Sequence, residues 1–165
     1  MQLHERYRQN ALAYCVAAEK LNADEADAFI APASLCLAFA IELFLKCVLL
    51  KAGKTEQELA RKPYGHDLWL MWNLPELQDQ RQQANLQAES CFQDLVGEGS
   101  SIRGVPPPNT FDQYLQELSR LHTSASNMAL RYPEKLTLVP ECALLLCVFD
   151  RLIRAERLGD KIIRC

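Results

Sequence analysis

The stretch from Pro32 to Gly53, which reads PASLCLAFAIELFLKCVLLKAG, constrains the fold of this chain more than any other. Proline is favoured in the first turn of a helix and glycine just beyond the last turn, so the spacing predicts a helix between these two residues. This helix is apolar on nearly all sides, which is typical of a helix covered by neighbours on most faces. We therefore expect it at the centre of a helical protein.

The remaining segments also show helical spacing, and none alternates convincingly like a β-strand. We expect further helices over about residues 3–21, from Gly65, from Pro75, from Asn109 to the sequence RYP, and from about Pro140 to Gly159. The prediction is an all-α fold, a bundle of five or six helices, formed by a single domain over residues 1–165. Glycines and prolines over residues 97–109 predict a mobile loop between two of these helices.

Charge and hydropathy restrict the partners and the location that we expect. The net charge is -3 and the pI is about 5.6, so no overall basic field draws the protein to nucleic acid, and a contact with RNA or DNA needs a local patch. The longest uncharged run, from Ala28 to Ile41, is too short to span a bilayer. The N-terminus lacks the apolar core of a signal peptide. We expect a cytoplasmic protein without a membrane segment.

The seven cysteines are odd in number, contain no CxxC pair and lie mostly within apolar helical patterns. This usage is typical of small buried residues in a reducing cytosol rather than of a disulfide framework, and the short paired spacings of zinc sites are missing. The three histidines, His4, His66 and His122, are far apart in the sequence. A histidine metal site would need a carboxylate to complete it, and nothing specific in the sequence indicates one. No metal and no cofactor is predicted.

Two charged residues, Glu42 and Lys46, interrupt the apolar central helix. They are four residues apart and so share one helix face, with the acidic residue first, which is the favoured order. Each charge needs a partner on a central helix, because an unpaired buried charge is costly. Two interpretations stay open. The residues form a structural ion pair that reaches the surface, extended by Arg131, or they line a polar cleft beside the helix.

Three further polar residues, Asp67, His66 and Arg131, also have two interpretations each. Asp67 can cap the N-terminus of the next helix, where its hydrogen bond and its charge are both favourable, or it can belong to a site. His66 can transfer protons near neutral pH, or it can be a hydrogen-bonded core residue. Arg131, with Tyr132 beside it, can complement a helix C-terminus, or it can clamp a phosphate or a carboxylate.

Three short sequences, in a fixed order, resemble those of HEPN domains (higher eukaryotes and prokaryotes nucleotide-binding domains). They are AIELFLKCVLLKAG, which holds an E-x-x-L-K pattern from Glu42 to Lys46, then GHDLWLMW from Gly65, then LRYP, which contains Arg131 and Tyr132. The resemblance spans roughly residues 33–160. It implies an up-and-down helical bundle that often dimerises through its long helices.

The resemblance also implies classes of function. Many HEPN proteins are metal-independent ribonucleases of toxin–antitoxin and antiviral systems that use an R-x(4–6)-H motif near the last helices, while others lack the motif and serve as binding or scaffolding modules. Here the arginines of the last helix, Arg151, Arg154 and Arg157, have no histidine after them. The one match to the motif, RKPYGH from Arg61 to His66, lies before the last helices, in the connection that leads into GHDL.

We therefore expect a HEPN-like binding or regulatory module of a prokaryotic toxin–antitoxin or antiviral defence system. The expected partners are a second copy of the chain, a cognate antitoxin or another complex partner, and RNA or a nucleotide. Two alternatives stay open: a metal-independent RNA-cleaving toxin that uses His66 with Arg61 or Arg131 in catalysis, and a purely structural subunit of a helical oligomer. The residues expected to form one polar network are Glu42, Lys46, His66, Asp67, Arg131 and Tyr132.

Overall fold

The computed structural model describes residues 1–23, 29–61, 64–97, 109–123, 129–130 and 142–162. No residue in these ranges belongs to a β-strand, which confirms the predicted all-α fold. Five of the helices are long, and α3 and α4 are single turns. The helices in chain order are α1 (Leu3–Asn22), α2 (Ile30–Lys51), α3 (Glu56–Leu59), α4 (Leu68–Trp72), the 3-10 helix η2 (Pro75–Leu77), α5 (Gln78–Gly97), α6 (Asn109–His122) and α7 (Ala143–Ile162).

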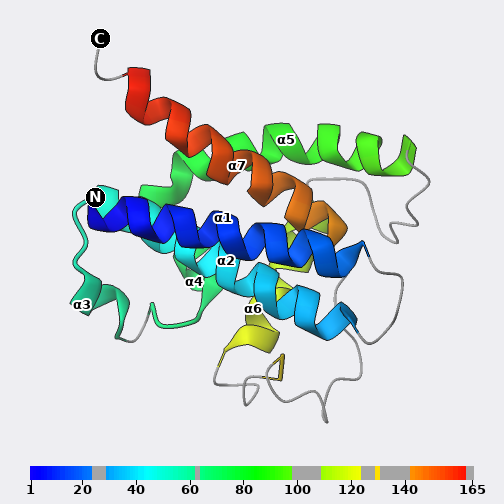
Figure 1. The fold of residues 1–165 in the computed structure, drawn as a ribbon, viewed down its shortest axis with the longest axis horizontal. Helices are drawn as coiled ribbons and strands as arrows, with labels where there is room; N and C mark the ends of the chain where they lie inside the picture. The colour runs from blue at the N-terminus through cyan, green and yellow to red at the C-terminus, as the bar shows by residue number, and fades with distance from the viewer. Residues whose placement is uncertain (24–28, 62–63, 98–108, 124–128, 131–141, 163–165) are drawn as a thin grey trace.

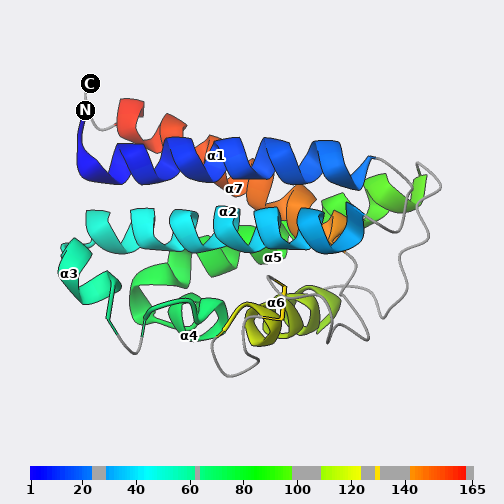
Figure 2. The ribbon, with the colours of Figure 1, turned by 60° about the horizontal axis from the view of Figure 1, so that its bottom comes forward.

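The helix α2 lies at the centre of the bundle, as its apolar circumference predicts. The helix α1 runs antiparallel along one side of it, and α5 and α7 form a second antiparallel pair in which α7 also contacts α1 (Figure 1). The helices α4 and α6 contact each other and lie on the side of α2 opposite to α1 (Figure 2). The middle of α2 is therefore enclosed between two layers of helices, and this is where Glu42 and Lys46 lie.

Small side chains let α1 approach α2 closely. The buried positions on α1 include Ala11, Cys15 and Ala18, which recur at helical spacing and so form one face. Arg8 continues this face toward the N-terminus and is also buried. Its guanidinium group donates two hydrogen bonds, of 2.8 and 2.6 Å, to the carboxylate of Glu5. This fork neutralises the one large charged group on the packing face of α1.

Four aromatic rings join the two layers. The ring of Phe149 on α7 lies 6.1 Å from that of Phe44 on α2, 5.6 Å from that of Trp72 on α4 and 5.9 Å from that of Phe111 on α6, measured between centroids. Trp72, Phe44, Phe111 and Phe149 are all almost fully buried. Aromatic pairs at such separations add to the stability given by burial alone. The aromatic cluster therefore sets how α4 and α6 are placed against α2.

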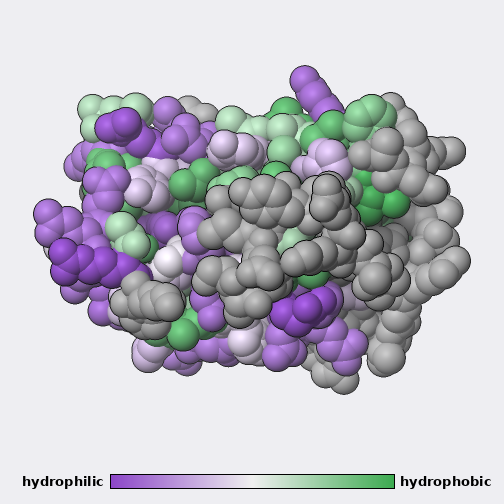
Figure 3. Space-filling model, turned by 90° about the horizontal axis from the view of Figure 1, so that it is seen from below, coloured by the Kyte–Doolittle hydropathy of each residue, from purple (hydrophilic) through white to green (hydrophobic). Residues whose placement is uncertain are grey.

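The helix α2 is long and apolar enough to cross a membrane by length and composition, but most of that stretch is buried inside the bundle. The buried core helix of a helical bundle can have the same length and the same apolar composition as a membrane-spanning helix. Seen from below, hydrophilic side chains are interspersed with hydrophobic ones over the coloured surface (Figure 3). Among the described residues, the exposed large hydrophobic side chains are Met1, Leu3, Tyr14, Ile30, Leu86 and Val96, and they come from several parts of the chain.

The helix α6 ends earlier than predicted. It stops at His122, whereas the sequence predicts that it continues to RYP. The hydroxyl of Thr123 donates a 3.1 Å hydrogen bond to the carbonyl of Arg120, a side-chain bond that competes with helix propagation. The buried residues Ala129 and Leu130 then return to the core, where the amide of Leu130 contacts the carbonyl of Leu121. Of the predicted loop over residues 97–109, residues 98–108 lie outside the described residues.

The prediction that the cysteines are small buried residues rather than a disulfide framework is wrong for one pair. A disulfide joins Cys91 on α5 to Cys147 on α7, whose Cα atoms are 5.9 Å apart. The two residues are 56 positions apart and meet because α5 and α7 pack side by side, which local spacing does not reveal. Among the described residues, the buried free cysteines follow the prediction, and they are Cys15, Cys47 and Cys142. Burial raises the pKa of the Cys15 and Cys47 thiols to about 12, so they are poor nucleophiles.

We expect the disulfide to stabilise the bundle by about 2–4 kcal/mol, because it restricts the unfolded chain. Reduction of the wild-type protein should lower its midpoint of urea unfolding, and Cys91→Ser should remove this dependence on reductant. The matched control is Cys47→Ser, which changes an equally buried cysteine outside the disulfide. This control should lose stability but keep the response to reductant. Equal wild-type midpoints with and without reductant would contradict the prediction.

Candidate functional site

The central helix contributes a buried ion pair to the site. Glu42 and Lys46 lie one turn apart on α2, and the Lys46 Nζ atom is 2.7 Å from the Glu42 Oε1 atom. Glu42 is 5% exposed and Lys46 is 8% exposed. The pair is therefore removed from water. An ion pair of the same spacing on the surface would add little to the stability of the fold. The second carboxylate oxygen of Glu42, Oε2, remains for other partners.

The turn before α4 brings His66 to this free oxygen. Gly65 has a φ of 28°, a left-handed conformation that glycine adopts most easily. Asp67 then caps α4, because its Oδ1 atom accepts a 2.9 Å hydrogen bond from the amide of Leu70. Between these two residues, His66 points toward α2, with its Nδ1 atom 2.9 Å from the Glu42 Oε2 atom.

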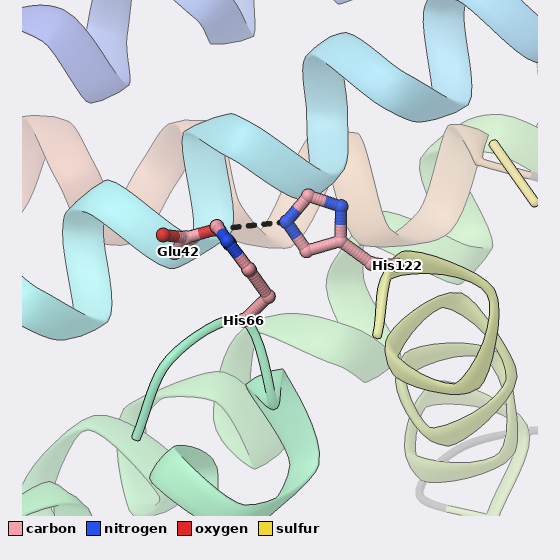
Figure 4. A group of neighbouring side chains, drawn as sticks. All are labelled: Glu42, His66 and His122. Atoms are coloured by element: carbon pink, nitrogen blue, oxygen red, sulfur yellow. Dashed lines mark hydrogen bonds and ion pairs between the residues drawn. The ribbon is translucent and has the colours of Figure 1, made fainter. Parts of the chain in front are cut away.

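The last residue of α6 completes the cluster. His122 is 1% exposed, and its Nε2 atom lies 2.8 Å from the same Glu42 Oε2 atom. Figure 4 shows the side chains of Glu42, His66 and His122 pointing toward one another from three separate segments. The two imidazole rings meet edge to face at 5.5 Å, and Phe39 lies edge to face against His122 at 5.1 Å. We call Glu42, Lys46, His66 and His122 the Glu–His cluster.

Ser119 holds the two histidine-bearing segments in register. Its hydroxyl accepts a 2.9 Å hydrogen bond from the amide of Trp69 and donates a 3.2 Å bond to the Asp67 Oδ1 atom. Ser119 lies nearly one turn before His122, and Asp67 directly follows His66. The link between Ser119 and Asp67 therefore aligns α6 with the start of α4, and it places both imidazoles on one side of Glu42.

The donors around Glu42 keep its carboxylate ionised. Burial raises the pKa of the Glu42 carboxyl, but the hydrogen bond from His122, the charge of Lys46 and the hydrogen bond from His66 outweigh it and lower the pKa to about 2. An ionised carboxylate only accepts hydrogen bonds, so His66 donates through Nδ1 and His122 donates through Nε2. The other nitrogen of His122, Nδ1, is buried and has no hydrogen-bond partner among the described residues.

In the structure, some of the residues of the predicted polar network lie close together and others do not. Glu42, Lys46 and His66 lie together, which agrees with the expectation of a polar cluster beside the central helix. Asp67 instead serves as a helix cap that faces Ser119. Arg61 is exposed, and no hydrogen bond or ion pair found in the described part of the chain connects it to the Glu–His cluster. Arg131 and Tyr132 lie outside the described residues.

Sequence reasoning missed His122 as a member of the site. The residue lies on the apolar stripe of α6, where a histidine is readily read as a core residue. A usable signal is nevertheless present, because a histidine on an apolar face needs a hydrogen-bond partner, and the central helix offers a buried carboxylate. His122 is 80 positions away from Glu42, so only the tertiary fold pairs them.

The cluster also supplies the carboxylate that a histidine metal site requires. The potential ligand atoms of Glu42, His66 and His122 all lie within 4.8 Å of one another. The sequence indicated no acidic partner for the histidines, and the structure corrects this point. Two imidazoles and one carboxylate are a donor set that suits zinc and neighbouring transition metals.

Comparisons with known proteins give no relative for this chain. No family model matches it, no curated protein is similar to it, and no solved structure is similar to it. The resemblance to HEPN domains accordingly rests on the three sequence motifs alone. Of those motifs, the described residues include E-x-x-L-K on α2 and GHDL at the start of α4.

Proposed function

We propose that the chain is a HEPN-like helical module that binds or regulates a partner in a prokaryotic toxin–antitoxin or antiviral defence system. One observation carries the proposal: Glu42 and Lys46 of E-x-x-L-K, which are buried, and His66 of GHDL, which is partly exposed, carry the resemblance and meet in one cluster. A well-packed apolar group of similar volume is often as stabilising as a buried ion pair, or more so. The presence of the cluster in the core therefore favours a role beyond stability.

The proposed partners follow from the resemblance and from charge. We propose a homodimer in the cytoplasm that associates with a cognate antitoxin or another protein of the same system. A net charge of -3 disfavours broad attraction to nucleic acid, so a contact with RNA or a nucleotide would be local. This balance of charge favours a protein as the main partner.

A second candidate function is metal-independent cleavage of RNA, and the geometry of His66 favours it. The hydrogen bond from His66 Nδ1 to Glu42 leaves Nε2 as the nitrogen that can accept a proton, and the side chain of His66 is 37% exposed. A histidine oriented by a carboxylate can act as a general base toward a 2'-hydroxyl group. In this alternative, Arg61 or Arg131 would bind the phosphate.

Cells that express the chain can distinguish the two functions. The binding module predicts intact total RNA in cells that express the wild-type protein, because no catalytic step depends on His66. The RNA-cleaving alternative predicts RNA loss and growth arrest that His66→Ala abolishes, with Arg61→Ala and Arg131→Ala showing which cation takes part. All proteins are compared at matched soluble levels. His4→Ala is the control, since it removes a histidine outside the cluster.

A complex with a defence partner is the second test. The chain is co-expressed with the products of its neighbouring genes, and its mass is measured by light scattering after purification. The proposal predicts a homodimer, or a complex of fixed stoichiometry with one of these products. A monomer that binds none of them, in cells whose RNA stays intact, would contradict the proposal.

A further inference from the structure

The Glu–His cluster has the layout of an open metal site. Glu42 Oε2, His66 Nδ1 and His122 Nε2 come from three segments and converge on one point, with both nitrogens within 2.9 Å of the oxygen. A zinc ion lies about 2.0–2.2 Å from such ligands, which places tetrahedral donors roughly 3.3–3.6 Å apart. The three atoms already lie within 4.8 Å of one another. Small side-chain movements would therefore make room for an ion.

The donor atoms select a class of ion. Imidazole nitrogen suits zinc and its neighbours in the first transition row, whereas calcium and magnesium prefer oxygen ligands alone. The Oε1 atom of Glu42 is occupied by Lys46, so the carboxylate would bind the ion through Oε2 only. His66 is the partly exposed member of the three, and this exposure gives the ion an entry path and a position for a bound water.

Tautomer exchange frees both nitrogens without a change in charge. In each imidazole, the nitrogen that would bind the ion carries a proton and donates a hydrogen bond to Glu42. Metal binding would move the proton of His66 to Nε2 and the proton of His122 to Nδ1. That Nδ1 atom has no partner among the described residues, so the exchange breaks no other hydrogen bond there.

We propose that Glu42, His66 and His122 bind a divalent transition-metal ion of the zinc class, with Lys46 limiting the affinity. The Lys46 ammonium group lies 2.7 Å from the carboxylate and repels a second cation at the site. Affinity for the ion and the charge of Lys46 are therefore opposed. This inference does not depend on a role in defence, on RNA or on a protein partner.

The test titrates Zn²⁺ and Co²⁺ into the full-length protein after chelator treatment. Calorimetry should give one ion per chain, and Co²⁺ should show the visible absorption of a nitrogen and oxygen site. His66→Ala and His122→Gln should each weaken Zn²⁺ binding by at least about 10–100-fold, which loss of even an outer-shell partner commonly causes. His4→Ala should bind like the wild-type protein. Circular dichroism confirms that each variant is folded, and the partly exposed His66 gives the variant that disturbs the core less than a change at the buried His122.

Lys46→Met separates a metal site from a structural network. Loss of the ammonium charge should tighten Zn²⁺ binding by at least about tenfold, because the repulsion disappears and the buried carboxylate needs a new counterion. Three results would each overturn the proposal: no stoichiometric binding to the wild-type protein, equal binding after loss of either histidine, and a Co²⁺ spectrum of thiolate ligation by cysteine. None of these readouts involves RNA, growth or complex formation, so they leave the proposed function to its own tests.

Discussion

Replacement of Glu42 by alanine should destabilise the bundle by about 3–5 kcal/mol, the usual cost of removing one partner from a buried ion pair. The change leaves the Lys46 ammonium group buried without its counterion, and it leaves the N–H groups of His66 and His122 without their acceptor. Urea unfolding followed by circular dichroism measures the loss. A loss below about 1 kcal/mol, typical of an ordinary substitution, would show that the cluster is not buried as described.

The double variant Glu42→Leu with Lys46→Met is the matched control. It removes both charges and keeps an apolar volume, so most of the lost stability should return. The recovery should be incomplete, because His122 is 1% exposed and still has no acceptor for its N–H group. If the double variant is as unstable as Glu42→Ala, then lost packing and not the unpaired charge causes the effect.

The pKa of Glu42 adds a pH dependence to this result. The pKa falls from 4.5 to about 2 in the folded protein, so the folded state favours the ionised form. The stabilisation is complete above pH 4.5 and is lost as the pH falls toward 2. Glu42→Gln lacks this titration, so the difference in stability between the wild-type and variant proteins should shrink over that pH range.

Replacement of Phe149 by alanine should cost about 3–5 kcal/mol, as large-to-small changes of buried aromatic residues do. Phe149 is fully buried, and its ring contacts those of Phe44, Trp72 and Phe111. The cavity would lie where α2, α4, α6 and α7 meet. Urea unfolding followed by tryptophan fluorescence reports this change directly, because Trp72 is one of the neighbours.

Leu86→Ala is the control for the aromatic cluster. Leu86 lies on α5 and is 70% exposed, so its loss should change the stability by no more than about 0.5 kcal/mol. Similar losses for the two variants would mean that Phe149 does not join the two layers. A loss for Phe149→Ala alone would support the assigned core.

The sequence predicts the elements of this fold better than their contacts. The central position of α2 follows from its apolar circumference, and the proximity of Glu42 to Lys46 follows from helical geometry. The capping role of Asp67 was one of two interpretations, and it depends only on its place beside a helix start. These features are local, so the sequence of about one helix is enough to predict them.

The features that sequence reasoning missed are those that join distant segments. The hydrogen bond between His122 and Glu42 spans 80 positions, and the disulfide spans 56. Periodicity identifies the buried face of α6, but it does not state which side chain of another helix that face will meet. The end of α6 was also missed, because a hydroxyl bond back to the carbonyl of Arg120 competes with a continuing apolar stripe.

The position of the Glu–His cluster between two layers has a consequence for motion. Lys46 and Glu42 belong to α2, whose partner α1 packs along it, while the disulfide ties α5 to α7. Both histidines belong to the layer of α4 and α6, which the hydrogen bond between Ser119 and Asp67 holds in register. Detachment of α4 and α6 alone would uncover the carboxylate and leave the disulfide-tied helices folded, a local opening that hydrogen exchange can detect. Such an opening would add to the access that the partly exposed His66 already gives, and its free energy sets how often the buried side of the cluster meets solvent.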